Sequence, residues 1–210
     1  THSFRDCKKL KTVNMDDYIL NNIPSSPLFY GSNNVEYISA KNLTIKKSGF
    51  GCAPTYATAG MENNVLTEIV GIDTWKIETD DLSYLFAGYH KLESVDISNW
   101  NLENVTNMSS MFEHCKSLTH DIEIPSHITN CSNMFKGCTS MTHIRSNWNN
   151  SYTNEITATG CYSGCTAISH IDGKNVLAYE GDIGLDYVPS EWGGNGLVES
   201  DTSILRINIT

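Results

Sequence analysis

The chain has 210 residues, of which 40% are hydrophobic, and its formal net charge at pH 7 is −10. This length and apolar content are enough to bury a sizeable core. No basic cluster is longer than the Lys8–Lys9 and Lys46–Lys47 pairs, so binding to nucleic acid or to an anionic membrane surface is not expected, because such binding needs clustered Lys and Arg. No apolar run has the length of a membrane span.

A repeated phrase runs along the chain. An aromatic residue, usually Phe, is followed three positions later by Cys in four of the copies, and an apolar residue follows after three more. Copies aligned on this anchor position begin at residues 4, 29, 60, 86, 112, 135 and 162. Their spacing of 23 to 31 residues is typical of leucine-rich repeats, which run about 20–29 residues. The longest spacing contains a Gly-rich stretch at 46–60, which we interpret as a loop insertion.

Each copy predicts one short strand and one short helix. Apolar and polar residues alternate, as in half-buried strands, at 10–16, 35–41, 66–72 and 92–98. The segment 104–115 places its apolar residues at the spacing of one face of a short helix. Neither element can bury its apolar face alone, so the copies are expected to stack on one another.

The predicted fold is an α/β solenoid of about seven irregular leucine-rich repeats over residues 1–172, with a parallel β-sheet on one face and short helices on the other. Residues 173–210 depart from the repeat, and we expect them to form a C-terminal cap or the start of a further domain. Since the first copy starts inside a repeat and without Met, we expect the chain to be a fragment of a larger protein.

The aromatic and Cys positions of the phrase are predicted to pack in the core. Ser32 and Tyr89 replace Cys in other copies, a change that a catalytic or metal-binding thiol would not tolerate. Cys is small and mildly apolar, which suits a tightly packed interior column. The predicted core comprises Phe4, Cys7, Phe29, Phe86, Phe112, Cys115, Phe135, Cys138 and Cys165.

The stretch VDISNWNLENVTNMSSMFEHCKSL at 95–118 closely resembles the BspA-type leucine-rich repeat, which occurs in bacterial surface proteins and in phage tail proteins. The resemblance covers residues 1–172, with decreasing fidelity outward from 82–144. It implies a non-catalytic binding protein without a cofactor, located at the cell surface, in the extracellular space or in a virion. The family has no catalytic residues to carry over, and the sequence contains no nucleophile-elbow, zinc-protease or phosphate-loop motif.

Three of the seven histidines share one repeat position. His120, His143 and His170 each lie eight residues after their anchor, so they are predicted to form a row on one face. Such a row can take up a soft metal or simply face water on an exposed strand. We predict no metal site and assign the row to a binding surface.

The predicted binding surface combines the exposed strand face with Trp positions, because Trp is common at binding hot spots. Trp75 and Trp100 occupy nearly the same repeat position, where the alternative interpretation is that they cap the core. The predicted binding residues are Glu36, Glu68, Trp75, Glu93, Asp96, Trp100, His120, His143, Trp148 and His170.

The acidity of this surface predicts a basic or neutral-polar partner, namely a protein or glycan on another cell or particle. The alternative function is a structural spacer or assembly component of a larger particle such as a phage tail, for which a homo-oligomer is expected.

Overall fold

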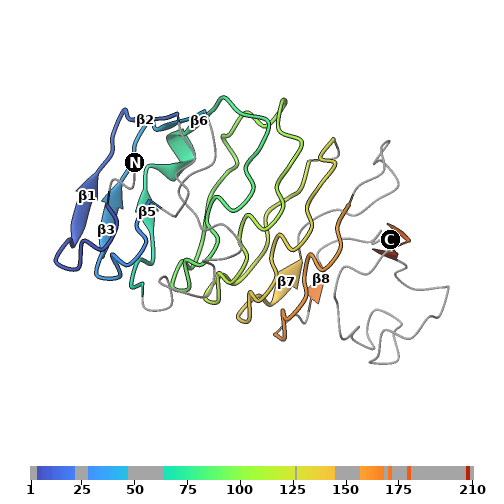
Figure 1. Ribbon diagram of the computed structural model, residues 1–210. Helices are drawn as coiled ribbons and strands as arrows, with labels where there is room; N and C mark the ends of the chain where they lie inside the picture. The colour runs from blue at the N-terminus through green and yellow to red at the C-terminus, as the bar shows by residue number, and fades with distance from the viewer. Residues whose placement is uncertain are drawn as a thin grey trace.

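The computed structural model describes residues 4–21, 28–46, 64–125, 127–144 and 157–167, and the strand residues 170–171, 179–180 and 207–208. The chain turns back on itself once per repeat, and successive repeats lie side by side (Figure 1). Parallel pairing between equivalent positions joins the repeats, so this is a repeat fold with parallel sheets.

Two three-stranded parallel sheets form in the N-terminal repeats. The first sheet has the order β1 (Thr12–Asn14), β3 (Tyr37–Ser39) and β5 (Ile69–Val70). The second has the order β2 (Ile19–Leu20), β4 (Thr44–Ile45) and β6 (Lys76–Ile77). The predicted strands at 10–16, 35–41 and 66–72 contain β1, β3 and β5, which confirms them.

The strand register places equivalent repeat positions next to one another. Val13, Ile38 and Ile69 are consecutive partners in the first sheet and are all buried. Because neighbouring strands are parallel and in register, every repeat position forms a column that runs along the molecule. The segment 92–98 is not a named strand, but the Glu93 N–H joins this pattern by donating to the Thr67 carbonyl at 3.3 Å.

Further strands continue the pairing toward the C-terminus. β7 (His143–Ile144) and β8 (His170–Ile171) are parallel, as are β9 (Tyr179–Glu180) and β10 (Ile207–Asn208). β1, β3, β5, β7 and β8 follow one another along the molecule (Figure 1). Isolated parallel bridges link Asp81 to Asn107, Asn107 to Asn130, and Asn130 to Thr157.

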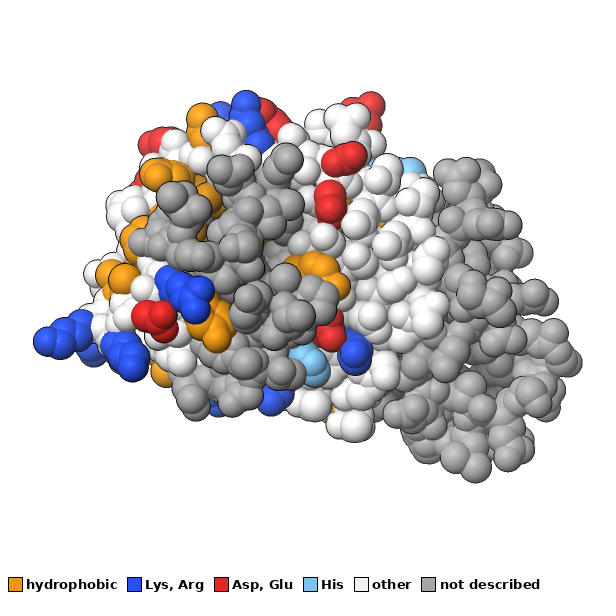
Figure 2. Space-filling view, in the orientation of Figure 1, with side chains coloured by type: hydrophobic (Ala, Val, Ile, Leu, Met, Phe, Trp, Pro, Cys, Tyr) orange, Lys and Arg blue, Asp and Glu red, His pale blue; other side chains and the backbone are white. Residues whose placement is uncertain are grey.

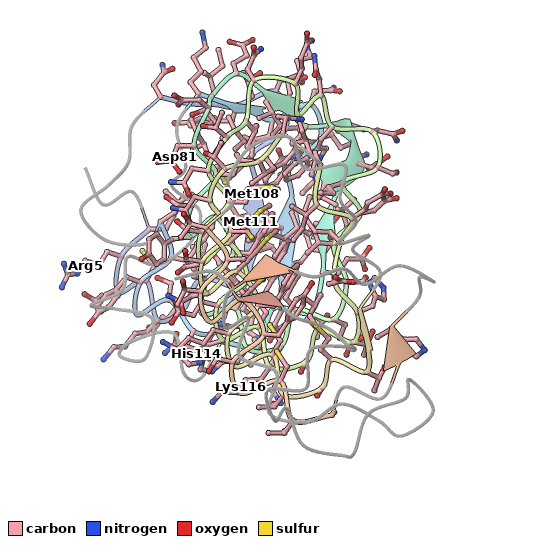
Figure 3. The ribbon with its side chains drawn as sticks, turned by 90° about the vertical axis from the view of Figure 1, so that its right-hand side faces the viewer. Arg5, Asp81, Met108, Met111, His114 and Lys116 are labelled. Carbon is pink, nitrogen blue, oxygen red and sulfur yellow. The ribbon has the colours of Figure 1, made fainter. Side chains whose placement is uncertain are left out.

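The predicted short helices are absent from the described residues, and that part of the fold prediction is wrong. The one helical segment described is a 3₁₀ turn, η1 (Ile72–Thr74). The segment predicted as a helix, 104–115, instead makes successive turns in which Met111 N–H donates to Met108 O and Cys115 N–H donates to Phe112 O. Its apolar side chains still point inward, and Figure 3 shows Met108 and Met111 inside the molecule.

Left-handed residues explain why this segment does not become a helix. Ser110 has φ 54° and His114 has φ 63°, and a right-handed helix cannot continue through either. Alternate N–H groups turn toward the next repeat, as when Met108 N–H donates to the Asn130 carbonyl at 2.8 Å. The i, i+3, i+4 spacing of apolar residues therefore arises here from chained turns rather than from a helix.

A stack of aromatic rings forms the centre of the core. The ring centroids of Phe86 and Phe112 are 5.4 Å apart, those of Phe112 and Phe135 are 5.5 Å apart, and those of Phe135 and Tyr162 are 5.4 Å apart. The predicted core residues Phe29, Phe86, Phe112, Cys115, Phe135, Cys138 and Cys165 are buried, whereas Phe4 and Cys7 are half-buried. Offset stacking of this kind adds to the free energy gained by burying the rings.

Candidate functional site

The strand face is the outward-facing side of the first sheet and of its continuation toward β7. Side chains alternate along β3, where Tyr37 is 47% exposed and Ile38 is fully buried. The described residues that we assign to this face are Glu36, Tyr37, Glu68, Glu93, Asp96, His120 and His143. All the acidic members are exposed, and both histidines are half-buried, so the predicted acidic and histidine positions are accessible to a partner.

Carboxylates dominate the N-terminal part of the strand face. Glu36 forms an ion pair of 2.8 Å with Lys11 of the preceding repeat. Asp96 accepts the Ser98 N–H at 2.9 Å, and the hydrogen bonds from Ser98 lower the pKa of Asp96 below its ordinary value. On the side drawn in Figure 2, positive and negative side chains are mixed rather than gathered into one patch.

Histidines occupy the C-terminal part of the strand face. His120 bridges His143, and His143 pairs with His170, both in parallel register, which confirms the predicted row at the level of the backbone. His120 Nδ1 lies 3.1 Å from the Asp121 carbonyl, and His143 Nδ1 lies 2.8 Å from Thr142 Oγ1. Among the side chains that the structure describes, no three His, Cys, Asp or Glu residues converge as a metal site.

The two described tryptophans lie in the core, so the prediction that they are exposed binding residues is wrong. Trp75 is 3% exposed and Trp100 is 7% exposed, and their rings stack at 5.5 Å. Each Nε1–H donates a 2.7 Å hydrogen bond to a carbonyl of the preceding repeat, that of Ala40 or Ile72. With its one polar group satisfied, an indole ring can pack fully inside. The remaining predicted residue, Trp148, lies outside the described residues.

Comparison with protein-family models decides the family. Residues 56–171 match the model described as Mycoplasma protein of unknown function, DUF285, and residues 1–69 match the model described as BspA type leucine rich repeat region (6 copies). The chain belongs to the DUF285 family and carries BspA-type leucine-rich repeats. No curated protein and no solved structure matches it. Repeats of this family are typically non-catalytic and are consistent with a protein-binding module.

The Cys column, formed by the Cys residues three positions after the anchors, is a packing element. The thiols of Cys115, Cys138 and Cys165 donate to the carbonyls of Phe86, Phe112 and Phe135, respectively, at 3.1–3.2 Å. Burial raises the pKa of the Cys115 and Cys138 thiols well above the ordinary value. Since the thiolate is the reactive form, these groups are poor nucleophiles and poor metal ligands.

The sequence analysis missed a buried polar pair in the repeats matched by the DUF285 model. Asp121 is 1% exposed, and its carboxylate accepts a 2.8 Å hydrogen bond from the Tyr162 hydroxyl. The sequence does indicate this pair through two departures from the repeat pattern: Asp121 stands at an apolar strand position, and Tyr162 stands at the anchor position that is usually Phe. Within the part of the chain that is described, no helix is long and apolar enough to cross a membrane.

Proposed function

We propose that residues 1–172 form a solenoid that binds a partner non-catalytically through the strand face. The observation that carries the proposal is the in-register column of outward-facing side chains. Parallel strands about 4.8 Å apart repeat the same position again and again, which presents a nearly flat, regular surface to another molecule.

The thiols and indoles of the described core offer no competing binding chemistry. Cys115, Cys138 and Cys165 are buried and their thiols donate to carbonyls, and Trp75 and Trp100 are buried as well. Recognition therefore depends on the surface, where loops and strand faces of repeat proteins commonly bind their partners.

The chemistry of the strand face suggests the kind of partner. Glu68 in one repeat and Glu93 and Asp96 in the next are exposed, and the strand register places Glu68 beside Tyr37, which is 47% exposed. Carboxylates beside an aromatic ring suit a protein surface with basic groups or a neutral glycan. We assign the chain to a bacterial cell-surface protein or a phage tail protein that contacts a host protein or glycan.

The test is a binding screen with charge-neutral variants. Labelled wild-type chain is applied to a glycan array and to a panel of purified extracellular proteins, and hits are quantified by surface plasmon resonance. The triple variant Glu68→Gln/Glu93→Gln/Asp96→Asn should bind roughly 10-fold more weakly, because complementary charges on the partner lose their counterparts.

A matched control separates the strand face from net charge. The variant Asp73→Asn/Asp80→Asn/Glu103→Gln removes the same three charges from positions outside the named strands and should bind as the wild type does. Equal binding by both triple variants and the wild type would contradict the proposal. Self-association in analytical ultracentrifugation without any binding partner would favour the structural spacer instead.

A further inference from the structure

The turn that follows each aromatic anchor carries a large share of the positive charge. In the six copies with an aromatic anchor, this turn comprises residues 5–9, 30–34, 87–91, 113–117, 136–140 and 163–167, which we call the turn edge. Of the 14 basic residues in the chain, the turn edge holds Arg5, Lys8, Lys9, Lys91, Lys116 and Lys136. Of the 24 acidic residues, it holds only Asp6 and Glu113. The turn edge is therefore positive although the chain has a net charge of −10.

Stacking of the repeats brings the turns together along one side of the molecule. The Ser117 N–H donates to the His90 carbonyl at 3.1 Å, and the Ser140 N–H donates to the Lys116 carbonyl at 3.0 Å. Equivalent turn positions are thus in register across the fourth, fifth and sixth repeats. Figure 3 shows Lys116 and His114 at the lower side of the molecule.

Both acidic residues of the turn edge are already neutralised by cations of the same edge. Asp6 forms an ion pair with Arg5 at 3.2 Å, and Glu113, which is 8% exposed, forms one with Lys136 at 3.3 Å. The other lysines of the turn edge are exposed and take part in none of the ion pairs that the described residues form; they are Lys8, Lys9, Lys91 and Lys116. Their ammonium groups are available to an anionic partner.

The positive field of the turn edge acts on His114. Burial lowers the pKa of His114, the nearby Glu113 carboxylate opposes this effect, and the charges of Lys136 and Lys116 add to the lowering. Lysines from two successive repeats thus lie close enough to act on one imidazole.

We propose that the turn edge binds a linear sulfated glycan through Lys8, Lys9, Lys91 and Lys116. Repeats lie about 4.8 Å apart, so the four lysines extend over about 19 Å from the first repeat to the fifth. A row of this length fits a polymer that carries an anionic group at intervals, rather than one small anion. Ammonium groups bind sulfate oxygens as charge-assisted hydrogen-bond donors.

Neutral polar side chains between the lysines support a glycan as the partner. The described turn positions next to the lysines carry Asn34, Ser117, Thr139 and Ser140, all exposed or half-buried. Amide and hydroxyl groups both donate and accept hydrogen bonds, as the hydroxyl groups of a sugar do. The turn edge therefore offers partners both for the sulfate groups of a glycan and for its hydroxyls.

The turn edge suits nucleic acid less well. DNA carries one negative charge per about 1.7 Å, and the acidic surface outside the turn edge repels such a dense anion. Single strands also need open aromatic faces on which bases stack. Neither tyrosine of the turn edge offers one, because the Arg5 guanidinium lies over the Tyr30 ring at 4.8 Å and Tyr89 is 1% exposed.

The inference does not rest on the function proposed for the strand face, because the two surfaces carry opposite charge. The variant Glu68→Gln/Glu93→Gln/Asp96→Asn should bind a sulfated glycan no more weakly than the wild type does. Failure of one proposal therefore leaves the other to be judged by its own variants.

The experiment measures binding of the full chain to a fluorescent heparin oligosaccharide by anisotropy, with desulfated heparin and single-stranded oligothymidylate as comparison ligands. The decisive variant is Lys8→Gln/Lys91→Gln/Lys116→Gln. The matched control removes three exposed lysines from outside the turn edge, Lys41→Gln/Lys46→Gln/Lys76→Gln. A third variant, Lys8→Arg/Lys91→Arg/Lys116→Arg, keeps the charge. Thermal unfolding of each variant verifies that it is folded.

The wild type should bind heparin and bind both comparison ligands more weakly. The turn-edge Gln variant should bind heparin about 10-fold more weakly and with a smaller dependence on salt, because three ion pairs are lost. The matched control and the Arg variant should retain most of the wild-type affinity. The inference is overturned if the wild type does not bind heparin, if both Gln variants lose affinity equally, or if oligothymidylate binds more tightly than heparin.

Discussion

The Tyr162 hydroxyl and the Asp121 carboxylate are joined by a 2.8 Å hydrogen bond across 41 residues of sequence, inside the core. Asp121 lies nine residues after its anchor, where other repeats have Val13, Ile38 or Ile69, and Tyr162 takes the place of the Phe in the aromatic stack. Both residues are polar exceptions at repeat positions that are otherwise apolar. The hydrogen bond between them lets both side chains stay buried in the core. A buried carboxylate is tolerated only when it is hydrogen-bonded.

The pair predicts a strong coupling between two substitutions. Tyr162→Phe should lower the free energy of unfolding by about 1–3 kcal/mol, because the buried Asp121 carboxylate loses the hydrogen bond from the Tyr162 hydroxyl. Adding Asp121→Val to Tyr162→Phe should recover much of this loss, since two apolar groups then replace a polar pair. Urea unfolding of the two single variants and the double variant measures the coupling. Additive losses in this cycle would show that the two residues act independently.

The turn at Gly137 predicts a second coupled pair. Gly137 has φ 75°, and a Cβ added there would lie 2.5 Å from His114 Nδ1 of the preceding repeat. Gly137→Ala should therefore destabilise the protein by more than about 1 kcal/mol, through both the left-handed backbone and the clash.

Combining Gly137→Ala with His114→Gly tests the clash separately from the backbone strain. The cost of Gly137→Ala should fall when the His114 ring is absent, and chemical denaturation of the four proteins in the cycle gives the difference. An unchanged cost in the His114→Gly background would mean that backbone strain alone accounts for the effect.

The buried thiols predict a clear labelling pattern. Cys115, Cys131, Cys138 and Cys161 are fully buried, and burial raises the pKa of the Cys115, Cys138 and Cys161 thiols. Iodoacetamide should leave these four unmodified in the native protein and alkylate all of them in urea without reductant. Peptide mass spectrometry measures the modification at each site, and half-buried Cys7 should be the first of the described thiols to react. Native labelling of Cys115 or Cys138 would contradict the packing role of the Cys column.

Asp16 predicts a specific loss of stability in acid. Hydrogen bonds from the Ser39 hydroxyl at 2.7 Å and the Lys41 N–H at 2.8 Å lower the pKa of Asp16 in the folded protein below its ordinary value of 3.8. The unfolded chain then takes up this proton at a higher pH than the folded protein does. The stabilisation is present above pH 3.8 and is lost as the pH falls through the lower folded value.

Unfolding midpoints in urea from pH 5 to pH 2 measure this effect. The difference between the wild type and Asp16→Asn should shrink toward the acid end, whereas Asp80→Asn serves as a control carboxylate in an exposed bend. A constant difference across this range would rule out a contribution from Asp16 ionisation.

The repeat period and the order of the columns were predictable from sequence alone. The anchors at 86, 112 and 135 stack as consecutive rings, and the histidines eight residues after the anchors at 112 and 135 fall into one row. The prediction of the columns succeeds because every repeat must bury the same positions against its neighbours. The spacing of the anchors along the chain therefore determines the register between neighbouring repeats.

Local backbone geometry and burial were decided by the tertiary structure. The apolar spacing at 104–115 suits a helix and a chain of turns equally well, and hydrogen bonds to the next repeat select the turns, with Ser110 and His114 left-handed. Trp100 became a core residue because the Ile72 carbonyl of the preceding repeat satisfies its N–H. The Asp121–Tyr162 bond likewise depends on partners that come together only when repeats stack, because a hydrogen bond is decided by distance in space rather than by spacing along the chain.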